Sequence, residues 1–488
     1  MHRCLSIEEL LNLVCEELDG FDALPKLART AKVFQEPALN TLWRRQESMD
    51  PLFSALPSDM FIRNPREQWD VTRIKDVTVG TSDNQLGLGG RECYTAVRHA
   101  FELFYPNESY LPSPLILTTS LDNEEGWIMN DFVSTNLRSL TIYRASHPSM
   151  LTMLAGLSIR APMLTNLGVL CFTSDDVQSP LSESLPALQH LRSFTCIASI
   201  TDEALATLSG LPNLCRILFH LPKHPLSVAI PQQSSQPYFQ SINSAAVTTN
   251  RLHATTQFVK SWMVTSPICE FQAFITGRDE VWSDSPHIPL VALVAERYFD
   301  NLTSFVLTSE ERFPSINSTH SNSLSSQDFH PLLLCKKIEI FKIYLPCSLA
   351  NFDDESLKKM ANAWPGLRKI TLLPYSQQQP SLCSFQSLVH LSRGCPKLES
   401  VSITFSLGQD SSFSIDGGVP NVMGLGLTEL HDGLSPLEQT SAPAVASFLR
   451  SLAPNLRNVS KEGRYVRVGF YTIEEVNFWA EVNELLNV

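Results

Sequence analysis

The sequence predicts an α/β protein in which three short N-terminal helices precede an irregular solenoid of helix–strand repeats with a parallel sheet. The first 45 residues contain three helical segments with well-marked boundaries. Farther along the chain a short phrase recurs: a helix-like stretch, a breaker such as Pro, then x-Leu-x-x-apolar-x-apolar. With 488 residues, 43% of them hydrophobic, the chain is long enough to bury a large core.

The first helix is expected between Ser6 and Gly20. Ser6 and Glu9 form the S-x-x-E pattern of a capping box, in which the two side chains satisfy backbone N–H groups at the helix start. Gly20 is a typical helix stop. One face of this helix carries the apolar residues Ile7, Leu10, Leu11, Val14 and Leu18.

Two more helices are expected before residue 46. Asp22 can cap the second, and the third is predicted to begin near Pro37, since proline at a first helical position loses no hydrogen bond. The basic pair Arg44 and Arg45 suits the end of the third helix. Because about 40 residues seldom bury enough apolar surface to be stable alone, this module is expected to pack on a partner or on the rest of the chain.

The phrase from Leu27 to Trp43, LARTAKVFQEPALNTLW, follows the LSIEELL segment that begins at Leu5. Together they resemble the F-box motif, particularly that of filamentous and mushroom-forming fungi. In that family the module binds the Skp-type adaptor of cullin-RING ubiquitin ligases through apolar helix residues. The family usually has Leu-Pro where this chain has Leu5-Ser6. The resemblance implies adaptor contacts by Leu5, Ile7, Leu10, Leu11, Val14 and Leu18, with Phe34 and Trp43 as core or secondary contacts.

The resemblance implies a substrate-recognition adaptor of an SCF-type E3 ubiquitin ligase, whose repeats bind an unknown target protein and which is not itself an enzyme. Periodicity alone leaves another interpretation open, because the apolar face of an amphipathic helix usually packs internally. The three helices would then be a cap, and the protein a ligase-independent leucine-rich-repeat scaffold or protein-interaction module.

The recurring phrase is clearest at residues 136–142, 212–219, 365–372 and 396–403. In the best unit, a helical stripe from Leu357 to Trp364 ends at Pro365, and an alternating strand follows. Stacking such units closes a continuous core, as in a leucine-rich-repeat solenoid. The irregular spacing leaves an ordinary open α/β sheet as the alternative. A stripe from Ile473 to Leu485 is expected to cap the last repeat.

These patterns divide the chain into three parts. Residues 1–45 form the F-box, 46–110 a linker with the first helical elements, and 111–488 the leucine-rich-repeat-like solenoid. Three stretches poor in apolar anchors are expected as loop insertions, because they are rich in Ser, Thr, Gln, Asn or Gly. They lie near residues 222–257, 313–329 and 406–420.

Composition argues against several partners. The formal net charge of −13 and pI near 5.4 disfavour nucleic acid, which needs a surplus of Lys and Arg. No run approaches the ~18 apolar residues that a membrane-spanning helix needs. Eleven cysteines without a C-x-x-C pair fit a reducing compartment, so a soluble cytoplasmic or nuclear protein is expected.

No catalytic chemistry is expected. The sequence has no G-x-S-x-G, H-E-x-x-H or phosphate-binding P-loop motif and no zinc-type Cys/His spacing, so no catalytic residue, metal site or cofactor is assigned. The acidic run Asp353-Asp354-Glu355 and the pair Glu124-Glu125 are expected to be solvated acids where a helix or turn begins.

Overall fold

The computed structural model divides the chain into two compact units, Met1–Leu214 and Cys215–Val488. It describes residues 8–18, 23–46, 76–80, 116–120, 133–143, 148–170, 177–221, 238–276, 285–309, 323–345, 348–374, 382–405, 426–431, 442–456, 459–460 and 473–487. In both units parallel strands alternate with helices, so the chain has an α/β fold resembling a leucine-rich-repeat solenoid.

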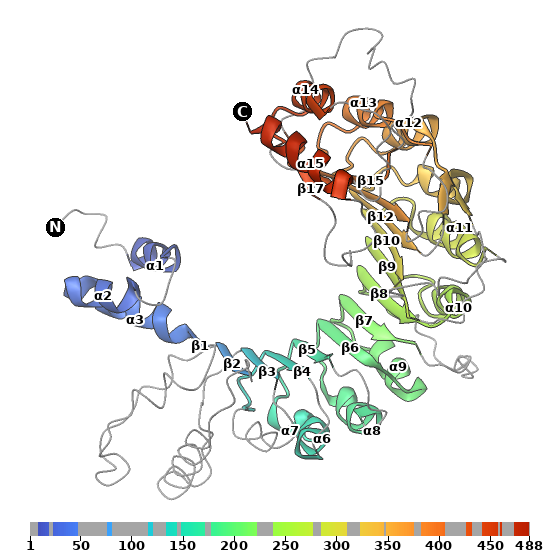
Figure 1. The fold of residues 1–488 in the computed structure, drawn as a ribbon. Helices are drawn as coiled ribbons and strands as arrows, with labels where there is room; N and C mark the ends of the chain where they lie inside the picture. Colours follow the sequence, from blue (N-terminus) through green and yellow to red (C-terminus); the bar gives the residue numbers. More distant parts are fainter. Residues whose placement is uncertain are drawn as a thin grey trace, which may run out of the picture. The chain divides into compact units, whose positions relative to one another are not determined.

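The first unit begins with three helices and continues as a parallel sheet whose strands follow one another in chain order, β1-β2-β3-β4-β5-β6. Helices α6 to α9 lie on one side of this sheet (Figure 1). The elements are α1 (Glu8–Glu16), α2 (Ala23–Thr30), α3 (Lys32–Arg44), β1 (Arg45–Gln46), β2 (Asp76–Gly80), β3 (Ile116–Ser120), β4 (Ser139–Tyr143), α6 (Pro148–Ala155), α7 (Leu157–Arg160), β5 (Asn166–Leu170), α8 (Gln178–Ser184), η5 (Leu185–Ala187), β6 (Ser193–Ser199) and α9 (Asp202–Ser209).

The second unit repeats the same plan, with parallel strands in the order β7-β8-β9-β10-β12-β14-β15-β16-β17. Strands β11 and β13 pair separately. The elements are β7 (Arg216–His220), β8 (Ser244–Thr249), α10 (Leu252–Trp262), β9 (Glu270–Ile275), α11 (His287–Tyr298), β10 (Ser304–Ser309), β11 (Ser323–Ser325), η7 (Ser326–Leu334), β12 (Ile340–Leu345), β13 (Ser348–Asn351), α12 (Asp354–Ala363), β14 (Lys369–Pro374), α13 (Gln386–Gly394), β15 (Ser400–Ile403), β16 (Glu429–His431), α14 (Ala442–Leu452), β17 (Val459–Ser460) and α15 (Ile473–Leu486).

One apolar column runs through each unit at the leucine of the recurring phrase. This side chain lies two residues before the strand, and it is at most 3% exposed in every described repeat from β4 to β16. Burying a Leu or Ile side chain contributes about 1.5–3 kcal/mol, so the column is a large part of the core. Its members are Leu137, Leu164, Leu191 and Leu214 in the first unit and Ile242, Ile268, Leu302, Ile338, Leu367, Leu398 and Leu427 in the second.

The residue after this leucine, here called the pre-strand position, joins consecutive repeats. Its carbonyl accepts two N–H groups from the next repeat, as Arg138 O does from Thr165 N at 2.7 Å and Asn166 N at 2.9 Å. The same pair of bonds recurs in the second unit, where Glu339 O accepts from Arg368 N at 2.8 Å and Lys369 N at 3.0 Å. The hydrogen bonds between neighbouring repeats therefore begin one residue before each strand, and these repeats share the same register.

The unit that the sequence marks best has the expected structure. Asp353 caps α12, since its carboxylate accepts the Ser356 N–H at 2.8 Å. The Ser356 hydroxyl also donates to this carboxylate, and this bond first, with the N–H bond, lowers the pKa of the Asp353 carboxyl. The helix ends before Pro365, and Trp364 is fully buried, with its indole N–H donating to the Leu332 carbonyl at 3.1 Å. Helix α15 is also present, packing against α14 as predicted for a C-terminal cap.

Four boundaries differ from expectation. The third helix begins at Lys32 and contains Pro37, so proline does not mark its start. The linker region contains strand β2. The expected insertion 222–257 is wrong beyond residue 243, where β8 and α10 form, and the insertion 313–329 is wrong from Ser323, where β11 and η7 form.

Strand β8 reads SAAVTT, and its small residues give little hydrophobic signal in the sequence. Its strand conformation is decided by pairing with β7 and β9. The insertion 406–420 lies outside the described residues.

Candidate functional site

Helix α1 turns some of its apolar residues toward its own module. Leu11 is 4% exposed and Cys15 is fully buried. Cys15 forms a small core with Leu24 of α2 and Ala38 of α3. Burial, together with the negative charge of Glu16, raises the pKa of the Cys15 thiol, so it stays protonated at neutral pH. The three helices therefore have a core of their own, though a small one.

Other apolar residues of this segment face away from that core. Leu10 is 41% exposed, Leu13 54%, Val14 50% and Leu18, just beyond the helix, 37%. At about 100° per residue, Leu10, Leu13 and Val14 fall within an arc of about 100° on the helix. We call Leu10, Leu13, Val14 and Leu18 the α1 outer face.

The structure separates the residues that sequence reasoning had grouped as adaptor contacts. Leu10, Val14 and Leu18 lie on the α1 outer face, whereas Leu11 is buried. Phe34, in α3, is half-buried. Leu5 and Ile7 lie outside the described residues, as does the side chain of Trp43, whose backbone belongs to α3.

Leu13 is an outer-face residue that the sequence reasoning missed. A helical wheel places Leu13 next to Leu10, on the side opposite Val14, so the sequence does contain a signal for it. The prediction of one continuous apolar stripe placed Leu11 beside Leu10. The packing of α1 on α3 divides that stripe between an inner and an outer side.

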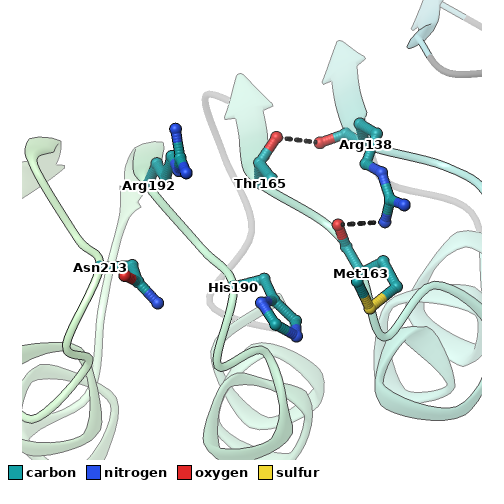
Figure 2. Close-up of a pocket in the computed structure, with 6 residues that line it drawn as sticks. All are labelled: Arg138, Met163, Thr165, His190, Arg192 and Asn213. Atoms are coloured by element: carbon teal, nitrogen blue, oxygen red, sulfur yellow. Dashed lines mark hydrogen bonds between the residues drawn. The ribbon is translucent and has the colours of Figure 1, made fainter.

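A second candidate site is an open hollow of about 280 Å³ in the first unit, at the edge where strands β5 and β6 begin (Figure 2). Arg138 donates a hydrogen bond from its guanidinium to the Met163 carbonyl at 3.0 Å. The hydroxyl of Thr165 donates to the Arg138 carbonyl at 2.9 Å. The lining residues come from successive repeats and are Arg138, Met163, Thr165, His190, Arg192 and Asn213.

The acidic run in the second unit has a structural role. Asp353 caps its own helix, and Asp354 accepts hydrogen bonds from Ser384 in the next repeat, so Asp354 is not simply a solvated acid. Within the described ranges no three His, Cys, Asp or Glu side chains gather in a way that could hold a metal ion. Among the helices that the structure describes, none combines the length and apolarity needed to cross a membrane.

Comparison with known proteins identifies no family. Neither the protein-family models nor the curated proteins include a match to this chain. Among solved structures, the yeast Rad7 and Elc1 complex matches at 12% identity over 71% of this chain and 83% of that chain, with a TM-score of 0.35. The TLR13–ssRNA13 complex matches at 12% identity over 80% of this chain and 57% of that chain, with a TM-score of 0.31. At such TM-scores neither likeness supports a functional inference.

Proposed function

We propose that this chain is the substrate-recognition adaptor of an SCF-type E3 ubiquitin ligase. Its N-terminal helices bind a Skp-type adaptor, and through it a cullin-RING ligase, while the repeats bind a target protein. The chain holds the two partners and performs no chemistry itself. We place this activity in the cytoplasm or nucleus, because eleven cysteines without a C-x-x-C pair fit a reducing compartment.

The observation that carries the proposal is the α1 outer face, whose four apolar side chains are between 37% and 54% exposed. A helix commonly docks into a groove of another protein through apolar residues spaced three and four apart, the spacing of Leu10, Leu13 and Val14. The inner side of α1 is already used by Leu11 and Cys15, so the module keeps its own core while presenting this face.

The Skp-type adaptor is proposed as the partner because of the resemblance to the F-box. This resemblance covers the phrase from Leu27 to Trp43 and the segment that begins at Leu5, so it takes in the first part of α1, the second half of α2 and all of α3 except Arg44. We assign adaptor contacts to Leu10, Val14 and Leu18 and add Leu13. Leu5, Ile7, Phe34 and Trp43 remain proposed contacts, and Leu11 is assigned to the module core.

The test is co-purification of the full chain with a Skp-type adaptor, comparing wild type with the double variant Leu10→Asp, Val14→Asp. Both side chains are about half exposed, at 41% and 50%, so the change should cost the free chain little stability. In a complex the same change would bury two carboxylates in an apolar interface, which is strongly unfavourable. The variant is expected to lose the adaptor.

The matched control is Ile159→Asp, in α7 of the same unit, which adds a carboxylate at a residue 82% exposed. This variant should retain the adaptor. Equal binding by the double variant and wild type would overturn the proposal. A wild-type chain that is folded and forms no stoichiometric adaptor complex would favour the ligase-independent repeat scaffold.

A further inference from the structure

The pre-strand position carries charged residues in both units, but the charges are balanced differently. In the second unit Glu339, Arg368 and Glu399 occupy it in successive repeats. The Arg368 guanidinium is paired with the Glu399 carboxylate through two hydrogen bonds of 3.0 Å, from Nε and from one terminal nitrogen. An arginine at this position can thus be neutralised by the neighbouring repeat.

In the first unit the corresponding residues are Arg138, Thr165 and Arg192, so two arginines flank a threonine (Figure 2). Among the described residues, the Arg138 guanidinium is bound to one carbonyl, that of Met163, at 3.0 Å. Arg192 is exposed, and its guanidinium has no hydrogen bond or ion pair within the described part of the chain. The imidazole of His190 adds a further polar group, and none of the six lining residues is acidic.

The lack of acidic residues around these two arginines does not reflect a shortage in the chain, which has 50 Asp and Glu against 37 Lys and Arg. With an ordinary strand spacing of about 4.8 Å, the backbones of Arg138 and Arg192 lie about 10 Å apart, with one strand between them. Two guanidinium groups that line one hollow repel each other. An anion bound between them would attract both, and this attraction would outweigh their repulsion.

We propose that this hollow binds a phosphoryl group, either as free phosphate or carried on another molecule. A guanidinium presents several N–H donors in a fork that matches the oxygens of a phosphate, and charge-assisted bonds of this kind are strong. Two arginines suit a doubly charged anion better than a single carboxylate. The proposal does not rest on the ligase role, because the hollow and the α1 outer face share no residue.

The test is calorimetric titration of the full chain with inorganic phosphate at low ionic strength. Arg192→Ala is the main variant, because the Arg192 side chain makes no hydrogen bond or ion pair to the described residues, and Arg138→Ala is the second. Each is expected to weaken phosphate binding about tenfold, the loss of one charge-assisted contact. Arg368→Ala, which removes an arginine from the same repeat position in the second unit, is the matched control and should bind as wild type does.

Further titrations distinguish the sources of the phosphoryl group. Binding of O-phosphoserine as tight as that of phosphate supports a group carried on a protein, and binding of phosphate alone supports the free ion. Acetate binding as tightly as phosphate would overturn the assignment to a phosphoryl group. Unchanged binding in Arg192→Ala and Arg138→Ala, or an equal loss in Arg368→Ala, would show that the hollow is not the site.

Discussion

The carboxylate of Asp354, the first residue of α12, accepts two hydrogen bonds from Ser384, the backbone N–H at 2.8 Å and the hydroxyl at 2.6 Å. A third bond comes from the hydroxyl of Ser387 in the first turn of α13. The N-cap residue of α13, Phe385, supplies no side-chain cap, and the Ser384 hydroxyl accepts the Gln386 N–H at 3.1 Å. The carboxylate of Asp354, in the preceding repeat, therefore fixes the start of α13 through hydrogen bonds.

Asp354→Ala is expected to lower the free energy of unfolding by about 1–3 kcal/mol, because the Ser384 N–H and the hydroxyls of Ser384 and Ser387 lose their charged acceptor. Urea denaturation followed by circular dichroism measures the change. Glu355→Ala is the control: its carboxylate is 56% exposed and is paired with Lys358, so its loss should cost far less. Similar losses in the two variants would contradict a linking role for Asp354.

Gly394→Ala should destabilise the contact between α12 and α13. A Cβ atom at Gly394 would lie 2.7 Å from the Ala361 Cβ and 2.8 Å from the Ala361 carbonyl oxygen, which is backbone and cannot move aside cheaply. Overpacking of this kind costs about 1–3 kcal/mol. The measurement is again the free energy of unfolding.

The glycine that follows α9 provides the control for this variant. At Gly210 a Cβ would meet no atom closer than 3.6 Å, and the residue has φ −90°, which alanine adopts readily. Gly210→Ala is expected to leave stability unchanged or to raise it by about 0.4–1 kcal/mol through the unfolded chain. If both variants proved neutral, the close approach of the two helices would be disproved.

His287 should make the fold less stable in acid. It is 2% exposed, and burial lowers the pKa of its imidazole although Asp328, at 3.1 Å from Nε2, favours the charged form. The unfolded chain takes up a proton near its ordinary pKa of about 6.5, whereas the folded chain does so only at lower pH. The stability contributed by neutral His287 is therefore complete above about pH 6.5 and declines as pH falls toward the lowered folded pKa.

Unfolding free energies measured between pH 7.5 and pH 5 would show this effect as a slope. His287→Gln should flatten the slope, whatever it does to stability at neutral pH. His253→Gln, at an exposed position in α10, should leave the slope as it is in wild type. An unaltered slope in His287→Gln would show that another group titrates.

Sequence reasoning succeeded where local signals agreed. The Pro after Trp364 and the alternating strand that follows mark the end of α12 and the start of β14, and the leucine of each clear phrase is buried as expected. It failed where a segment depends on its neighbours. Pro37 is tolerated inside α3, and Ser244–Thr249 becomes a strand through pairing with strands on both sides.

The sequence by itself determined the helix–strand order, the column of buried leucines and the amphipathic character of the first helix, because these follow from the spacing of apolar residues and from turn chemistry. Only the tertiary structure decided that Leu11 faces inward while Val14 remains 50% exposed, and that Arg138 and Arg192 share one hollow. The physical reason is that a helical or strand period fixes a side chain's direction on its own element. Which side is covered depends on packing against elements distant in sequence.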